Sequence, residues 1–219
     1  RTLESVMYNL RIDDEKLDNN LASSKTNDWH YKSELIPEIP KTNKKNNIGQ
    51  LDTVYPQLLK YTHDTKNPGA KALGIIFITH LLEDAHQPLH AMSNNLDNKN
   101  DKGGNRFCLQ KISKFTDHCS YNLHSYWDSA AKTLNNRHIY KLQEAVLNKY
   151  PKDKLLAKSQ NLNVNTWLKE SFEYWPQVYQ TARDLYPKQA YQDSVEKIAY
   201  ERIALAGYRL KEQLVVFLP

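Results

Sequence analysis

The chain has 219 residues, of which 40% are hydrophobic and 25% charged, and this composition fits one globular domain and excludes a chain that is disordered throughout. No apolar stretch reaches the ~20 residues that a bilayer-spanning helix needs, so a membrane-embedded protein is excluded. Only 6 glycines occur and no phosphate-binding glycine motif is present, which excludes dinucleotide-binding and P-loop folds. The net charge of +5 mildly favours polyanionic partners such as nucleic acid.

Helical periodicity dominates the sequence and predicts a mainly α fold. Apolar residues repeat at helical spacing over Leu51–Thr65, and this helix should end before Asn67-Pro68-Gly69. A second helix is predicted over Ala70–Gln87, because the ring of Pro88 removes a backbone donor and clashes with the preceding turn. Between Leu73 and Ile78 this helix is apolar on nearly every side, so it should lie at the centre of the molecule.

The middle of the chain predicts a loop and then one short β-hairpin. Residues Ser93–Asn105 are rich in Asn, Asp, Lys and Gly and should form the loop. The hairpin is expected at about Arg106–Tyr121, where a disulfide between Cys108 and Cys119 could join its strands. Such a disulfide indicates an exported protein, whereas two reduced buried thiols would indicate a cytosolic one. Further helices are predicted at about Asn122–Leu134, Asn163–Leu185 and Tyr191–Val216, and Pro40–Asn47 should form a basic loop.

Two pairs of His and Asp residues at i, i+4 spacing stand out as candidate metal ligands. His80 with Asp84, and His124 with Asp128, each place two ligands one turn apart on one helical face. Either pair alone could be a surface ion pair, and spacing equally permits a pair made of His86 and His90. Imidazole and carboxylate ligands without thiolates favour catalytic zinc. The residues themselves therefore predict a hydrolase with more than one metal ion.

Three ordered motifs resemble the zinc-dependent single-strand-specific nucleases, which share a fold with bacterial zinc phospholipase C. The motifs are Thr79–His90, Lys102-Gly103-Gly104-Asn105 and Asn122–Asp128. Trp29-His30-Tyr31 upstream and Arg202–Leu210 downstream also resemble segments of that family, so the likeness spans nearly the whole chain. It implies a single helical domain over residues 1–219.

The resemblance also implies a role for each candidate residue. His30, His80 and Asp84 would bind one zinc ion, and His90, His124 and Asp128 a second. Asp84 would take part in catalysis and bridge to a third ion, and His86 would be structural. Gly104 and Asn105 would contact the substrate, although a Gly-Gly-Asn sequence is also typical of an ordinary turn.

The sequence departs from the family pattern in two places near its start. Asn9 stands where the family has an Asp that binds the first zinc; an amide oxygen can bind a metal but carries no negative charge and cannot accept a proton from the attacking water, so Asn9 would weaken catalysis. Asp13, Asp14 and Asp18 are nearby alternatives. The family begins with a Trp whose amino group binds the third zinc, whereas this chain begins Arg1-Thr2-Leu3. The third site is therefore expected to be missing, and the expected number of bound zinc ions is two or three.

The resemblance implies hydrolysis of single-stranded DNA or RNA by a zinc-activated water, with 3′-nucleotidase activity, in a secreted or periplasmic protein. Tyr31, Tyr121 and Tyr126 are candidates for stacking on bases, although packing in the core is the usual role of such residues. A zinc phospholipase C and an inactive zinc-binding relative are the alternatives to the nuclease. A helical interaction domain with incidental histidines is a third.

Overall fold

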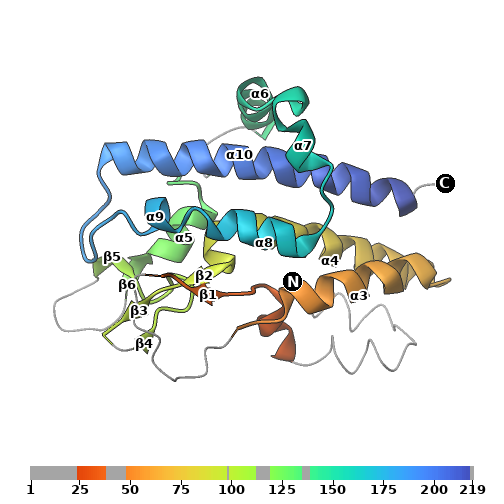
Figure 1. The fold of residues 1–219 in the computed structure, drawn as a ribbon, viewed down its shortest axis with the longest axis horizontal. Coiled ribbons are helices and arrows are strands. Elements are labelled where there is room, and N and C mark those ends of the chain that lie inside the picture. Colours follow the sequence, from red (N-terminus) through yellow and green to blue (C-terminus); the bar gives the residue numbers. More distant parts are fainter. Residues whose placement is uncertain (1–23, 38–47, 98, 112–118, 135–138, 218–219) are drawn as a thin grey trace.

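The computed structural model describes residues 24–37, 48–97, 99–111, 119–134 and 139–217, and it is mainly helical with short strand pairs (Figure 1). The predicted fold class is confirmed, while the single domain over residues 1–219 stays a prediction. Asn9, its alternatives Asp13, Asp14 and Asp18, and the loop Pro40–Asn47 all lie outside the described residues. None of the helices in the described ranges combines the length and the apolar character needed to cross a membrane.

The first two predicted helices are confirmed as α3 (Leu51–Asp64) and α4 (Pro68–His86). α4 starts two residues earlier than predicted, because the side chain of Asn67 accepts hydrogen bonds from the backbone N–H groups of Gly69 and Ala70. Pro68 at the first turn needs no hydrogen-bond partner for its nitrogen. α4 ends just before Pro88, as predicted, and a 3₁₀ turn, η2 (Pro88–His90), follows.

α4 is the central helix of the fold, as its apolar sequence predicted. It contacts α3, α10 (Gln189–Leu214) and α8 (Val164–Phe172) directly, and α10 runs along the opposite side of the molecule from α3 in Figure 1. The core shared by α3, α4 and α8 includes the fully buried Trp167. The other large side chains of this core are Leu51, Tyr55, Leu58, Leu73, Phe77, Ile78, Leu81, Leu82 and Leu168.

Short strands pair the segment before α4 with the segment after it. β1 (Glu34–Leu35) pairs in parallel with β2 (Met92–Ser93), which brings the chain after His30 beside the chain after His90. β3 (Asn95–Leu96) and β4 (Lys99–Asn100) form an antiparallel pair. The prediction of a plain loop over Ser93–Asn105 is therefore wrong in part, because Asp97 takes a positive φ of 50° that lets the chain reverse.

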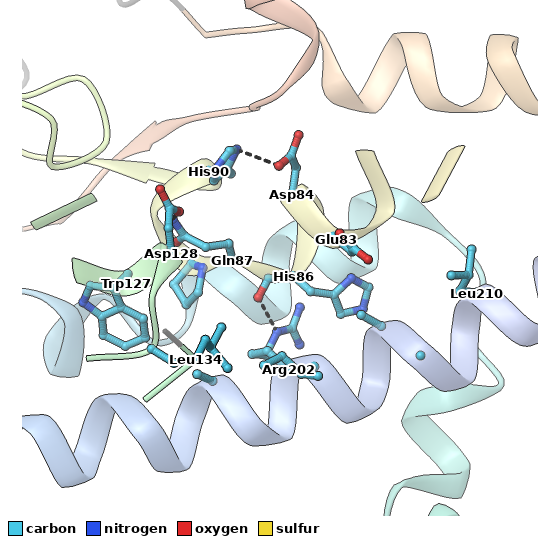
Figure 2. Close-up of a pocket in the computed structure, with 16 residues that line it drawn as sticks. Glu83, Asp84, His86, Gln87, His90, Trp127, Asp128, Leu134, Arg202 and Leu210 are labelled. Carbon is cyan, nitrogen blue, oxygen red and sulfur yellow. Dashed lines mark hydrogen bonds and ion pairs between the residues drawn. The ribbon is translucent and has the colours of Figure 1, made fainter. Parts of the chain in front are cut away.

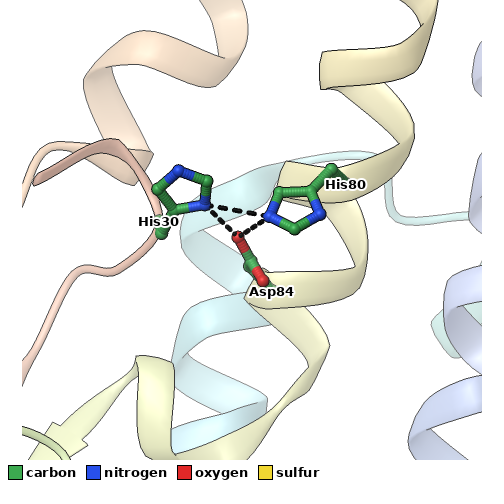
Figure 3. Close-up of side chains that lie close together, drawn as sticks. All are labelled: His30, His80 and Asp84. Carbon is green, nitrogen blue, oxygen red and sulfur yellow. Dashed lines mark hydrogen bonds and ion pairs between the residues drawn. The ribbon is translucent and has the colours of Figure 1, made fainter. Parts of the chain in front are cut away.

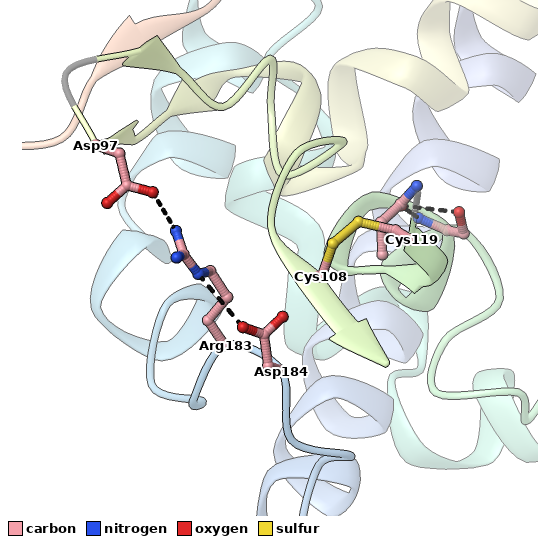
Figure 4. Close-up of a disulfide and its surroundings, with 7 residues drawn as sticks. Asp97, Cys108, Cys119, Arg183 and Asp184 are labelled. Atoms are coloured by element: carbon pink, nitrogen blue, oxygen red, sulfur yellow. Dashed lines mark hydrogen bonds and ion pairs between the residues drawn. A yellow bond between two sulfur atoms is a disulfide. The ribbon is translucent and has the colours of Figure 1, made fainter. Parts of the chain in front are cut away.

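The predicted hairpin is confirmed as β5 (Cys108–Lys111) and β6 (Cys119–Asn122), and a disulfide joins Cys108 to Cys119 (Figure 4). α5 (Leu123–Asp128) begins directly after β6, because the Asn122 side chain caps it through the Ser125 N–H. The backbone N–H of Asp184 donates to the carbonyl oxygen of Cys108 at 2.7 Å. The hairpin thereby holds α5 against the turn that precedes α10.

Several predicted boundaries are wrong, each for a local reason. α5 ends at Asp128 rather than Leu134, because Ala130, Ala131 and Lys132 take left-handed φ angles of 45° to 70°. The helix predicted over Asn163–Leu185 is two helices, α8 and α9 (Trp175–Val178), because Pro176 cannot continue α8. The remaining elements are η1 (Ser24–Trp29), α6 (Ile139–Lys149), η3 (Lys152–Leu155), α7 (Leu156–Ser159) and η4 (Val215–Phe217).

A buried ion network joins α4, α8 and α10. Glu170 of α8 accepts hydrogen bonds at 2.8 Å from Arg202 and Arg209 of α10, and both guanidinium groups are almost fully buried. Arg202 also donates to the His86 carbonyl oxygen at 3.1 Å, at the end of α4 (Figure 2). Burial alone would raise the pKa of Glu170, but the hydrogen bonds from Arg209 and Arg202 outweigh it and lower that pKa.

We predict that Glu170→Gln lowers the free energy of unfolding at pH 7 by about 3–5 kcal/mol, because it leaves two buried guanidinium groups without a counter-charge. Since the pKa of Glu170 is lowered on folding, its stabilising charge is present above the usual carboxyl range and is lost as pH falls through the folded pKa. Urea unfolding of variant and wild type should therefore differ at pH 7 and converge at acid pH. Glu212→Gln, which removes an exposed pair with Lys152, serves as the control and should change little.

Candidate metal centre

The C-terminal half of α4 presents two of the candidate ligands. His80 and Asp84 lie one turn apart on the same face, as the i, i+4 spacing predicted. His30, which follows η1, reaches the same place from a segment 50 residues earlier than His80. Figure 3 shows the three side chains meeting at the side of the helix.

The ligand atoms of this first group form a small triangle. His30 Nδ1 lies 2.9 Å from Asp84 Oδ2 and 3.0 Å from His80 Nε2, and His80 Nε2 lies 3.3 Å from Asp84 Oδ2. Four tetrahedral ligands at ~2.0–2.1 Å from a zinc ion are ~3.3 Å from one another. The three atoms are therefore close enough together to bind one metal ion.

A second group consists of His90 from η2 with His124 and Asp128 from α5, whose ligand atoms lie within 4.8 Å of one another. His124 Nδ1 lies 2.7 Å from the Gly103 carbonyl oxygen, and His90 Nδ1 is hydrogen-bonded to the His30 carbonyl oxygen. A carbonyl can only accept, so each imidazole donates from Nδ1 and keeps its lone pair on Nε2. Metal-binding histidines are commonly fixed in this way.

Asp84 faces both groups. Its Oδ2 atom belongs to the first group, and its Oδ1 atom lies 3.8 Å from His90 Nδ1 (Figure 2). Burial lowers the pKa of His90, while the Asp84 carboxylate opposes that shift. A lowered pKa favours the neutral imidazole, which is the form that binds a metal ion.

His86 joins neither group, although sequence spacing allowed it to pair with His90. It is buried, its Nδ1 donates to the Leu82 carbonyl oxygen at 2.7 Å, and its Nε2 lies 2.7 Å from Arg209 Nη1. Because arginine can only donate, His86 must be neutral with Nε2 accepting. Burial, followed by the charge of Arg202, holds the pKa of His86 well below its ordinary value.

Gln87 was not singled out from the sequence, yet it contacts the second group. Its Oε1 atom accepts from the Leu89 N–H, and its Nε2 atom donates to Asp128 Oδ1 at 2.8 Å. The remaining oxygen of Asp128, Oδ2, lies 3.7 Å from His124 Nε2. Gln87 thus orients the half-exposed Asp128 carboxylate. Its position directly before Pro88 was the available signal, but that position indicates a helix stop and not a ligand contact.

The Gly103–Asn105 turn borders the second group, and its contact with substrate stays a prediction. Gly103 and Gly104 take φ angles of +60° and +80°, which favour glycine. The Asn105 side chain donates to the Lys102 carbonyl oxygen at 2.9 Å. A cavity of about 320 Å³ lies here, lined by Asn105, Lys102, His124 and Tyr31 among others.

A second cavity, of about 370 Å³, is lined by other members of the two groups (Figure 2). Asp84, His90 and Asp128 are at its polar wall, and Ile203 and Leu210 of α10 line its apolar wall. The candidate centre is thus reached from two cavities, one mainly polar in its side chains and one largely apolar. Of the candidate stacking residues, Tyr31 lines the first cavity, whereas Tyr126 is fully buried in the core and packs against Tyr121.

We predict that Gly103→Ala lowers the free energy of unfolding by more than ~1 kcal/mol, because a side chain at positive φ is strained. Its Cβ would also lie 2.4 Å from the Leu89 carbonyl oxygen. Gly207→Ala is the matched control, since a Cβ there meets nothing within 4 Å and Gly207 lies inside α10. That control should raise stability by ~0.5–1 kcal/mol in urea unfolding. Equal effects of the two changes would contradict the close approach of the turn to η2.

Comparison with known proteins agrees with this geometry. Residues 12–218 match the model of the S1/P1 nuclease family, which is most of the chain. No match was found among curated proteins. The matched range includes every described residue of both candidate groups. The chain therefore belongs to the S1/P1 nuclease family, a family of nucleases that act on nucleic acid.

Proposed function

We propose that the protein is a zinc-dependent phosphodiesterase that hydrolyses single-stranded DNA or RNA and also acts as a 3′-nucleotidase. The proposal rests on one observation: two groups of three ligand-type side chains lie next to each other, and Asp84, a member of the first group, also lies near His90 of the second. His30, His80 and Asp84 would hold one zinc ion, and His90, His124 and Asp128 a second.

Each residue has a defined task in this proposal. Zinc held in the two groups would supply positive charge for the phosphate oxygens. It would also lower the pKa of a water molecule toward neutrality, so that the water can attack at neutral pH. Asp84 holds one face of the centre with Oδ2, while its Oδ1 faces the second group and is the carboxylate oxygen placed to accept a proton. Gln87 keeps Asp128 oriented through its 2.8 Å hydrogen bond. Asn9, by its chemistry, could contribute an amide oxygen but could not accept a proton.

The polar cavity beside His124 is the proposed place of the nucleotide. Lys102 lines it and supplies positive charge for a phosphate, and Asn105 with Gly104 forms its edge. Tyr31 offers a ring on which a base could stack. Because stacking and access to a recessed centre both require an unpaired strand, this cavity supports single-stranded over duplex substrates. The disulfide between Cys108 and Cys119 supports a secreted or periplasmic location.

The substrate class is tested by offering the purified protein denatured DNA, RNA, duplex DNA, a 3′-nucleotide and lecithin in parallel. We expect acid-soluble nucleotides from the denatured DNA and RNA, phosphate from the 3′-nucleotide, and much slower attack on the duplex. Release of phosphocholine without release of nucleotides would instead establish a phospholipase C. Binding of zinc with no turnover of any of these substrates would establish an inactive relative.

The roles of the metal and of Asp84 are tested together. A chelator should abolish hydrolysis of single-stranded DNA and added Zn²⁺ should restore it. Asp84→Asn should lower kcat by ~10²–10⁴-fold, because the amide neither carries the charge nor accepts a proton. Asp153→Asn, a change of the same kind on the exposed η3, should leave kcat unchanged. An Asp84→Asn variant as active as Asp153→Asn would refute the role given to Asp84.

A further inference from the structure

Asp101 is a buried carboxylate that the proposed chemistry does not use. It lies between β4 and the Gly103–Asn105 turn, and it has no exposed surface (0%). A carboxylate is rarely buried unless several donors satisfy its oxygens. The donors around Asp101 therefore indicate what the residue does.

The donors to Asp101 come from three parts of the chain. The Asn94 N–H donates to Oδ1 at 2.8 Å, and the hydroxyl group of Tyr179 donates to Oδ2 at 2.8 Å. The backbone N–H groups of Gly103 and Gly104 lie near enough to the carboxylate to help lower its pKa. Burial raises the pKa of Asp101, and the hydrogen bonds oppose that shift because they favour the charged form. The carboxylate is thus the common acceptor that fixes the turn.

One peptide unit links Asp101 to the candidate centre. The N–H of Gly104 and the C=O of Gly103 belong to the same peptide group, and in a trans peptide these two bonds point in opposite directions. The N–H end faces Asp101, and the C=O end accepts from His124 Nδ1 at 2.7 Å. A force that orients one end of this planar unit also orients the other.

The same turn also packs against Leu89, the residue directly before His90, the other histidine of the second group. A Cβ on Gly103 would lie 2.4 Å from the Leu89 carbonyl oxygen, so the turn packs directly on η2, which ends in His90. A Cβ on Gly104 would lie 3.2 Å from the backbone nitrogen of His124. A displacement of the turn would therefore disturb both histidines of the second group, whereas the first group has no described contact with it.

We propose that Asp101 is a positioning residue for the second group: its carboxylate, held by the Asn94 N–H and the Tyr179 hydroxyl group, attracts the nearby Gly104 N–H, aims the Gly103 carbonyl at His124 and so fixes the imidazole with Nε2 toward Asp128. Tyr179 acts through Asp101: its hydroxyl group holds the carboxylate in place, and its effect on the second group is smaller than that of Asp101. The turn contributes its Gly103 carbonyl group to the centre. This inference rests on the proposed binding of metal by the second group.

The test is a stepwise titration of the apo-protein with Zn²⁺ against a chromogenic chelator, for wild type, Asp101→Asn and Tyr179→Phe. Asp101→Asn keeps the shape but replaces the charged acceptor, and it should weaken one of the two zinc ions by ~10–100-fold while the other binds as in wild type. Its kcat on denatured DNA should fall by more than its KM changes. Tyr179→Phe removes one donor and keeps the charge, so it should weaken the same ion by a smaller factor.

Val146→Ala provides the control for a general loss of stability, because Val146 is buried between α6 and α10, far from the turn in sequence and in packing. It should lower the melting temperature without a selective loss of either ion. Loss of both ions in parallel in Asp101→Asn, or unchanged binding of both, would overturn the positioning role. If Asp101→Asn does not fold, equal zinc binding by Tyr179→Phe and wild type overturns it. A wild-type protein that binds no zinc would instead refute the proposed function itself.

Discussion

The shared carboxylate of Asp84 is the interaction on which the centre depends. One of its oxygens lies 2.9 and 3.3 Å from the ring nitrogens of His30 and His80, and the other lies 3.8 Å from His90. Oδ2 and the two ring nitrogens are close enough to bind one ion together, and His90, whose Nδ1 donates to the His30 carbonyl oxygen, keeps its Nε2 lone pair for the second group. Two adjacent divalent ions would fit this arrangement.

The rest of the fold holds the end of α4 in place for this purpose. Pro88 ends the helix, so that Asp84 and His90 lie on either side of a sharp turn. Arg202 and Arg209 of α10 both hydrogen-bond to His86 at that end of α4. Glu170 supplies one negative charge for the two guanidinium groups. Removing one partner from such a buried cluster is costly, because it leaves an uncompensated buried charge. The centre is thus built beside a helix end that is tied to α8 and α10.

The elements that could be predicted from the sequence are those with a strong local signal. α3, α4 and α10 follow from apolar periodicity, the hairpin from its cysteines, and the pairs His80–Asp84 and His124–Asp128 from helical spacing. His30 has no such signal, because a parallel pairing of only two residues, β1 with β2, brings it to the centre. The left-handed turn after α5 contains no glycine, and Asp101 looked like any polar loop residue. These features depend on contacts between distant segments, which periodicity does not reveal.

The most direct measurement is anomalous diffraction at the zinc edge from crystals of the protein grown with Zn²⁺. The account predicts one peak at ~2.0–2.2 Å from the nitrogen and oxygen ligands of His30, His80 and Asp84. It predicts another among His90, His124 and Asp128, with the Asp84 carboxylate beside both. Strong anomalous peaks that avoid these six side chains, or none at all in crystals that diffract well, would contradict the central claim.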